Sequence, residues 1–373
     1  NYLMFIFEQA FLVTLFVYFV NKNLGGKKTL ILFLLFIFYI GIFHMTYNFF
    51  TLFFLIIIYY LEKNYSSKDY LIGFIIGFSI LSKHVIGCML LIPMVIICFR
   101  NRCKLFKRFV GVFIPCFIFL IYLVINKSLY SFINLCFLGL FDFSSNNSRP
   151  SGVLFYLSIL IVIIFIYYII RHKDKKYLYY LPCSFFFAYP IFDQHHFSYL
   201  LFIFLFFLLD NYNRKDIKKN KITYVFIVLF IFNILFFISI LSLEKNVIKC
   251  DSKRFSLFYT NKPLCNTLRE KKKVLDKYCV NSKCIIIDDY GIVYNTSRDA
   301  DLSYFDVTFY GNLGYDGTNM MIKKIDSLKN NYFVIGTFCL NDGKYGQHNK
   351  EVIDYIIKNK TYVGKDYDFI VYK

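Results

Sequence analysis

The chain has 373 residues, of which 58% are hydrophobic and 22% aromatic, and its mean hydropathy is +0.52. Soluble domains contain roughly 45–50% apolar residues, so this composition excludes an ordinary soluble protein. The net charge of +19 does not indicate nucleic-acid binding, because Lys and Arg cluster in short gaps between apolar runs, as in cytoplasmic loops of membrane proteins. We therefore expect membrane lipids, and no nucleic acid, among the partners.

Apolar runs occupy most of residues 1–243. A helix that crosses the hydrocarbon core needs about 20 mostly apolar residues, or fewer where the bilayer is thin. Six runs are of about this length and are predicted to form one span each: Leu3–Val20, Arg108–Ile125, Val153–Ile170, Tyr177–Ile191, His195–Leu209 and Ile222–Leu243.

Two further runs, Thr29–Leu61 and Tyr70–Phe99, are too long for a single span. As straight helices they would measure roughly 45–50 Å, whereas the hydrocarbon core is about 30 Å thick. Polar residues lie near the middle of both runs, at 44–48 and 82–84. We therefore predict that each run forms two short helices joined by a tight turn, which raises the total to about ten spans.

The distribution of positive charge predicts the orientation. Loops on one side carry 19 Lys and Arg residues in total: 21–28, 62–69, 100–108, 171–176 and 210–221. Loops on the other side carry 3 in total: 44–48, 82–84, 127–152 and 192–194. This asymmetry predicts a multi-pass protein of the plasma membrane, with Asn1 outside and the tail from about Glu244 to Lys373 also outside.

One external loop contains a second kind of apolar segment. Leu129–Phe143 has the apolar density of a helix that lies in the membrane interface. A loop helix that packs on the bundle has the same spacing, so both interpretations stay open. Ser144–Gly152 is rich in Ser, Asn, Pro and Gly, which indicates an exposed loop.

From residue 244 onward the composition becomes that of a soluble α/β domain. Short β-branched and aromatic runs predict strands, and apolar residues at helical spacing predict helices. We expect strands at Cys284–Asp288, Tyr332–Thr337 and Tyr367–Tyr372, and helices at Asn319–Leu328 and Glu351–Ile357. This order indicates an extracytoplasmic α/β domain over 244–373, with a parallel or mixed sheet and helices on its faces.

The cysteines of this domain suggest disulfides rather than a metal site. In an oxidising compartment, the pairs Cys250–Cys265 and Cys279–Cys284 can form. The odd number of cysteines and the absence of a CxxC spacing argue against zinc. Gly311–Gly317 lacks the lysine of a phosphate-binding loop, so a turn before a helix is the favoured interpretation.

Polar and ionisable groups in or beside a membrane span are costly, so each is a candidate functional residue. In the predicted topology they lie towards the outer side: Glu8, His44, Tyr47, Asn48, Lys83, His84, Asp142, Asp193, Gln194, His195 and His196. A site that opens to the outside is therefore expected. Structural roles are the alternative, since Glu8 can pair with another helix and Lys83 can extend to lipid phosphates. Residues 193–196 can form a solvated turn, or hold a divalent metal ion or a phosphate.

Three stretches carry a recognisable pattern. Tyr47–Lys63 combines a short external turn with a span that ends in lysine, and Gly73–Lys83 ends a short glycine-containing helix in Leu-Ser-Lys. Tyr189–His196 contains a Pro-x-x-Asp-x-x-His turn. Together they resemble the membrane-embedded GT-C glycosyltransferases, in particular bacterial relatives of the protein mannosyltransferases and of aminoarabinose transferase. The tail, with Asp306 and Gly311–Gly314, is similar to the external domain of such proteins.

The resemblance implies a GT-C-like helical bundle and an inverting sugar transfer from a polyprenyl-phosphate donor to an acceptor on the outer side. It implies substrate binding by six residues of the outer turns: Tyr47, Asn48, Lys83, His84, Asp193 and His196. Lys83 and His84 would face the donor phosphate, and Asp193 and His196 would line the same cavity, with a divalent metal ion as one arrangement. The essential aspartate of the family lies in the first external loop, which we expect to precede Asn1. No catalytic base is therefore assigned, and the chain is expected to lack its natural N-terminus.

Two other functions fit a chain of this class. A transporter or lipid flippase would also have about ten spans, but it should show broken helices at the bilayer midplane and internal repeats. A membrane sensor without enzymatic activity would bind its ligand with the external domain. The donor sugar and the acceptor do not follow from the sequence.

Overall fold

The computed structural model describes residues 2–36, 46–139, 152–189, 192–211, 247–249, 259–279, 284–288, 314–328, 331–340 and 349–373. The chain divides into two compact units. Unit 1 comprises Asn1–Asn126 and Ser148–Ser239, and unit 2 comprises Lys127–Asn147 and Ile240–Lys373. The segment 127–147, which the sequence predicts to be an external loop, therefore groups with the C-terminal part of the chain.

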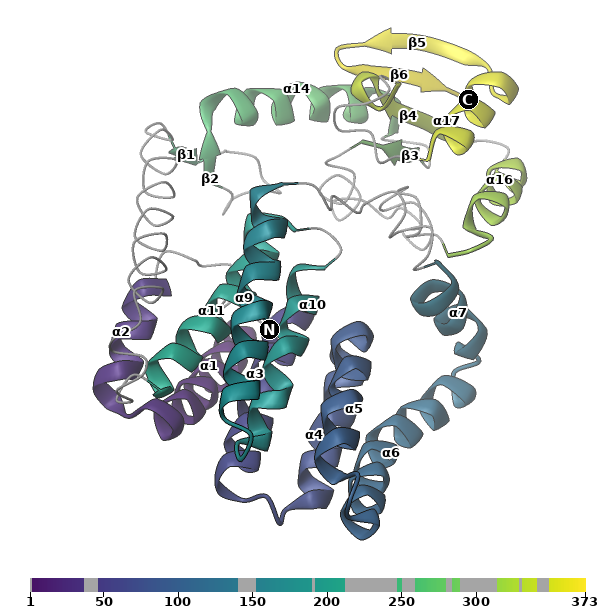
Figure 1. Ribbon diagram of the computed structural model, residues 1–373. Coiled ribbons are helices and arrows are strands. Elements are labelled where there is room, and N and C mark those ends of the chain that lie inside the picture. Colours follow the sequence, from purple (N-terminus) through teal and green to yellow (C-terminus); the bar gives the residue numbers. More distant parts are fainter. Residues whose placement is uncertain are drawn as a thin grey trace. The chain divides into compact units, whose positions relative to one another are not determined.

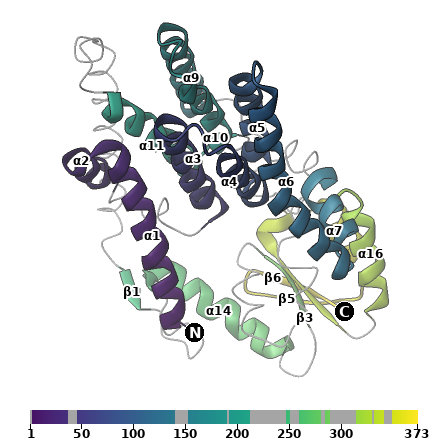
Figure 2. The same cartoon turned by 90° about the horizontal axis from the view of Figure 1, so that it is seen from below.

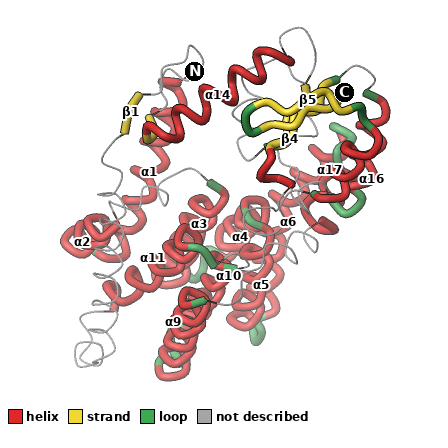
Figure 3. The backbone as a smooth tube through the Cα atoms, turned by 90° about the horizontal axis from the view of Figure 1, so that it is seen from above, coloured by secondary structure: helices red, strands yellow, loops and turns green. Residues whose placement is uncertain are grey.

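The described part of unit 1 consists of helices and the loops between them (Figures 1 and 3). Two of these helices, α6 and α9, are long and apolar enough to cross a membrane, by length and composition alone. The elements in chain order are α1 (Tyr2–Leu24), α2 (Gly26–Phe36), α3 (Tyr47–Asn64), α4 (Asp69–Ser82), α5 (His84–Cys98), α6 (Arg102–Ile125), α9 (Val153–Arg171), the 3₁₀ helix η3 (Lys176–Ser184), α10 (Phe185–Ala188) and α11 (Gln194–Asn211).

The predicted break at 82–84 is confirmed, because α4 ends at Ser82 and α5 begins at His84. Lys83 alone separates the two helices and has an extended backbone, with φ −145° and ψ 95°. Its N–H donates to a carbonyl in the last turn of α4, and its carbonyl accepts from the Gly87 N–H in the first turn of α5. Lys83 therefore closes one helix and opens the next.

In the other long run, α3 begins at Tyr47. The Thr46 hydroxyl accepts a hydrogen bond from the Phe49 N–H, which is the usual way for a threonine to cap a helix N-terminus. The capping residue fixes where the helix starts and therefore places Tyr47 in its first turn. His44, the other candidate in this predicted turn, lies outside the described residues.

The prediction of one helix over Tyr177–Ile191 is wrong. The 3₁₀ helix η3 is followed by the single turn of α10. Pro182 lacks the N–H that an α-helix needs, and Tyr189 precedes Pro190, which disfavours a helical backbone at Tyr189. Tyr189 is accordingly extended, with φ −74° and ψ 140°. The predicted span Ile222–Leu243 lies outside the described residues.

Glycines bring α4 and α6 into backbone contact. A Cβ atom on Gly73 would overlap the carbonyl oxygen of Arg108, and one on Gly111 would overlap that of Tyr70. Gly77, one turn after Gly73, faces α6 in the same way. Small residues four apart allow this close approach, and the GxxxG spacing is typical of helices packed in membranes.

This contact places Arg108 in a buried ionic cluster. The Arg108 side chain is 1% exposed, and its Nε donates to Asp69 Oδ1 at 2.8 Å. Its two terminal nitrogens donate to the Glu62 carboxylate, which also accepts from the Tyr180 hydroxyl at 3.0 Å. Four elements are thereby joined through one guanidinium, since these residues belong to α3, α4, α6 and η3.

Unit 2 contains all the strands that the structure describes (Figure 3). The strands are β1 (Val247–Lys249), β2 (Tyr259–Asn261), β3 (Cys284–Ile287), β4 (Tyr332–Gly336), β5 (Tyr362–Asp366) and β6 (Phe369–Tyr372). Its helices are α7 (Leu129–Ile133), the π-helix η2 (Asn134–Leu138), α14 (Lys262–Cys279), α16 (Gly317–Ser327), the 3₁₀ helix η4 (Thr337–Leu340) and α17 (Lys350–Asn359).

Four of these strands form a mixed sheet in the order β3-β4-β6-β5, and β1 and β2 form a separate antiparallel pair. β3 and β4 are parallel, whereas β6 is antiparallel to both β4 and β5. The predicted strands and the predicted helices at α16 and α17 are confirmed, with small differences at their ends. The sequence analysis did not predict α14 or β5.

Successive residues of the central strands pack on opposite faces of the sheet. Ile285 and Phe333 lie in a core with α16 and α17, while Ile286 and Val334 lie in a second core with α14. A strand that is covered on both faces is apolar throughout, which explains the continuous run CIII.

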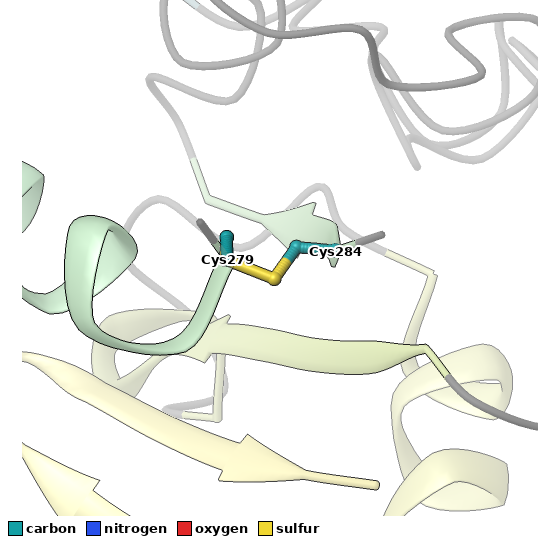
Figure 4. The surroundings of a disulfide bond; sticks show 2 residues. All are labelled: Cys279 and Cys284. Carbon is teal, nitrogen blue, oxygen red and sulfur yellow. A yellow bond between two sulfur atoms is a disulfide. The ribbon is translucent and has the colours of Figure 1, made fainter. Parts of the chain in front are cut away.

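A disulfide joins the end of α14 to the start of β3 (Figure 4). The two residues, Cys279 and Cys284, have Cα atoms 5.5 Å apart. One of the two predicted pairs is therefore confirmed. Cys250, which belongs to the other predicted pair, lies outside the described residues.

The ionic cluster predicts the effect of one substitution. Arg108→Met should lower the free energy of unfolding by about 3–5 kcal/mol, because Glu62 and Asp69 would keep buried charges without a cation. The measurement is unfolding of the whole chain in mixed detergent micelles. Arg102→Met in the exposed first turn of the same helix is the matched control and should change the free energy by less than about 0.5 kcal/mol. Equal effects of the two substitutions would contradict this account of the cluster.

Candidate functional site

Three segments that are distant in sequence meet around Lys83 in unit 1. Lys83 Nζ donates to Asn48 Oδ1 at 2.9 Å and to the carbonyl oxygen of Phe187 at 3.4 Å. The same ammonium lies 5.6 Å from the centre of the Tyr47 ring, a cation–π distance. The first turn of α3, the α4–α5 turn and α10 therefore all contribute to one site.

The cap of α3 explains the position of Asn48. Because the helix starts at Tyr47, Asn48 falls in its first turn, where its side chain is 1% exposed. A buried amide must be hydrogen-bonded, and Lys83 supplies a donor to its oxygen. Tyr47 beside it is exposed. The ammonium thus contacts both a buried amide and an exposed phenol ring.

Asp193 and His196 form the other part of the site. Asp193 precedes α11, and its Oδ1 accepts from the His196 N–H at 2.7 Å, as an N-cap does. The same oxygen lies 2.8 Å from His196 Nδ1. Phe192, directly before it, has φ +46°, a strained value for a bulky residue that often marks functional segments. The imidazole and the carboxylate are thereby fixed relative to each other and to the helix.

The electrostatic environment shifts the pKa of both charged groups. Burial lowers the pKa of Lys83 from 10.5 to about 8, although the charge of Asp193 acts in the opposite direction. For Asp193, burial raises the pKa, but the hydrogen bonds from His196 and the nearby imidazoles outweigh it, so the pKa lies below its ordinary value. At neutral pH the site therefore holds a positive Lys83 and a negative Asp193.

Lys83 differs from Arg108 and Lys63 of unit 1 in the charge of its hydrogen-bond acceptors. The Arg108 guanidinium contacts two carboxylates, and the Lys63 ammonium lies 2.6 Å from the carboxylate of Asp210. The hydrogen-bond acceptors of Lys83 are an amide and a carbonyl oxygen, which are neutral. Among the described residues Lys83 has no ion-pair partner, so an anionic group is the ligand that would balance its charge.

Tyr199 contacts residues that form this site, and the sequence did not indicate it as a candidate. Its hydroxyl lies 3.3 Å from the Thr46 hydroxyl, and its ring stacks on Phe187 at 5.7 Å. His195, one turn before it on α11, meets the ring edge-on at 5.4 Å. The spacing of four residues from His195 could have indicated Tyr199, because residues four apart lie on one face of a helix.

The structure links five of the six predicted substrate-binding residues: Lys83 contacts Asn48 and Tyr47, Asp193 contacts His196, and the charge of Asp193 acts on Lys83. The sixth, His84, directly follows Lys83 and begins α5. Glu8 is exposed on α1. His44 and Asp142 lie outside the described residues. Within the described ranges, no group of three His, Cys, Asp or Glu side chains is arranged to hold a metal ion.

This arrangement suits a ligand that carries a phosphate. Lys83 supplies an ammonium, Asn48 a buried amide, and Asp193 with His196 an oriented carboxylate–imidazole pair, while the Tyr47 ring lies beside the ammonium. Ammonium groups bind phosphate oxygens as point charges. The site therefore offers anion binding.

The lowered pKa of Lys83 can be measured directly. Only a neutral amine is acylated, so labelling of Lys83 by acetic anhydride should reach half its maximum near pH 8, well below the ordinary 10.5. Mass spectrometry of the labelled peptides gives this value, with the exposed Lys68 as an internal reference. Asp193→Asn should move the midpoint further down, since the carboxylate raises the pKa of Lys83. A midpoint near 10.5 would show that the site does not desolvate the ammonium.

Comparisons with known proteins add no identification to this geometry. The chain matches no protein-family model, no curated protein and no solved structure. The functional conclusion therefore depends on the residues of the site.

Proposed function

We propose that the protein is a multi-span membrane glycosyltransferase that moves a sugar from a polyprenyl-phosphate donor to an acceptor on the outer side of the membrane. One observation carries this proposal. Parts of the three segments that resemble GT-C enzymes interact with Lys83: its ammonium donates to Asn48 and lies beside the Tyr47 ring, and the charge of Asp193 raises its pKa. If the three segments bind one substrate, their residues must lie in one site.

In the proposed reaction the acceptor hydroxyl attacks the anomeric carbon of the donor sugar. The bond between that carbon and the phosphate oxygen breaks, a new glycosidic bond forms, and the hydroxyl proton passes to a base. Lys83 binds the phosphate and stabilises the negative charge that grows on it as it leaves. Asp193 keeps His196 oriented, and the Tyr47 ring lies beside the Lys83 ammonium.

Several features support the membrane topology in this proposal. The charge asymmetry of 19 to 3 between the two sets of loops favours the Lys83 turn on the outer side. Helices α6 and α9 have the length and composition of spans. The Cys279–Cys284 disulfide supports an extracytoplasmic position of unit 2, because disulfides persist in oxidising compartments and are rare in the cytosol.

The activity is tested in the full-length protein with a panel of radiolabelled polyprenyl-phosphate sugars. The assay uses native membranes, which supply the acceptor, and release of polyprenyl phosphate is the readout because every acceptor displaces the same leaving group. Lys83→Ala and Asp193→Asn should each reduce release by roughly 10²–10³-fold, the usual cost of removing one group that stabilises transition-state charge. The exposed Lys68→Ala and Asp174→Asn are matched controls and should release normally. Normal release by both site variants would exclude this site, and no release from any donor by the unaltered protein would favour a transporter or a sensor.

The orientation is tested by the disulfide. If thiols are blocked by alkylation before the cells are opened, mass spectrometry should recover the linked Cys279 and Cys284 peptides. Cys279→Ser together with Cys284→Ser should lower the free energy of unfolding by about 2 kcal/mol, as expected for a short closed loop. Alkylation of both thiols in the intact cell would contradict an extracytoplasmic unit 2.

A further inference from the structure

Unit 2 carries an apolar helical segment with mostly exposed large side chains. Residues 129–138 form α7 and the π-helix η2 without a break. Their sequence, LYSFINLCFL, contains Ser131 and Asn134 as its polar residues. Most of the large apolar side chains are exposed, and the most exposed is Tyr130 at 69%: Tyr130, Ile133, Leu135, Phe137 and Leu138.

The segment is attached to unit 2 by its polar side chain. Asn134 is 5% exposed, and its Oδ1 accepts a hydrogen bond from the Tyr315 N–H at 2.9 Å, just before α16. Gly314 has φ +81°, and a Cβ atom there would lie 2.5 Å from Asn134 Nδ2, so a glycine is required for this contact. Figures 1 and 2 show α7 beside α16. A helix that docks through an asparagine leaves its apolar residues facing outward.

We propose that residues 129–138 are a bilayer anchor of unit 2, with their apolar side chains inserted into the interfacial layer of the membrane. The chain itself identifies the bilayer as the occupant. α6 ends at Ile125, and Leu129 follows after three residues, a distance of at most roughly 14 Å. If α6 spans the membrane, the segment begins at the membrane surface. The inference rests on this part of the proposed function.

The residue types agree with that location. Tyrosine is enriched at membrane interfaces, where the ring is buried and the hydroxyl stays in water, and lysine keeps its charged end among the headgroups. Tyr130 and the exposed Lys127 stand at the end of the segment nearest α6. Tyr315, which is also 69% exposed, adjoins the segment through its bond to Asn134. The anchor thereby fixes the start of α16 at the membrane surface.

The absence of tryptophan from the sequence permits a direct test. Three single-tryptophan variants of the whole chain are reconstituted in phosphatidylcholine vesicles: Tyr130→Trp in the segment, Phe113→Trp in α6 and Tyr362→Trp in β5. All three positions are similarly exposed in the structure, at 69%, 60% and 59%. Quenching is measured with brominated acyl chains, which report contact with lipid, and with iodide, which reports contact with water.

The expected result is that Tyr130→Trp and Phe113→Trp lose most of their emission in brominated vesicles and resist iodide, while Tyr362→Trp shows the reverse. Iodide quenching of Tyr130→Trp, or protection from both quenchers as in a protein contact, would overturn the anchor while lipid quenching of Phe113→Trp upholds the span. Failure of lipid quenching at both positions would overturn the span and the anchor together. The sugar-transfer assay is separate from all these outcomes, so the enzymatic proposal can fail independently.

Discussion

The backbone contact between α4 and α6 is the constraint on which the arrangement of unit 1 depends. Gly73 and Gly111 remove the side chains that would hold the helices apart. At one end of α4 this contact brings Asp69 to Arg108, and the other end of α4 leads directly into Lys83. A single short helix therefore connects a fully paired buried cation with one whose charge is only partly balanced. The first stabilises the bundle, and the second is available to a ligand.

The parts of the fold that the sequence predicted are those that depend on local pattern. The break at Lys83 follows from a run too long for one span with polar residues at its middle, and β3 and β4 follow from short apolar runs buried on both faces. The helix α14 was missed because its sequence, with six Lys or Arg residues in 18, shows mainly charge. Its apolar stripe is narrow, since a single face covers the sheet. The span predicted over Tyr177–Ile191 was wrong because the prediction relied on apolar content, whereas Pro182 and Pro190 disfavour a continuous α-helix.

In the site, too, some residues could be predicted from local sequence pattern and others could not. Tyr47, Lys83 and Asp193 were predicted because charged and polar residues are conspicuous in an apolar sequence. The carbonyl of Phe187 has no signature of residue type, since every residue carries one, so its role appears only in three dimensions. The Arg108 cluster was missed for a related reason. Its partners Glu62 and Asp69 are 46 and 39 residues away, and loop counting treats all three as solvent-facing charges.

The lengths of α4 and α5 have a consequence for the membrane around them. With 14 and 15 residues they measure about 21 and 22 Å, while a typical hydrocarbon core is about 30 Å thick. In the proposed topology this mismatch is relieved by local thinning of the bilayer, with headgroups drawn inward at the Lys83 turn. The phosphate of a polyprenyl-phosphate donor, which lies at the level of the headgroups, would then be at the same depth as the Lys83 ammonium. The proposed sugar transfer would accordingly depend on bilayer thickness and would be fastest in thin membranes.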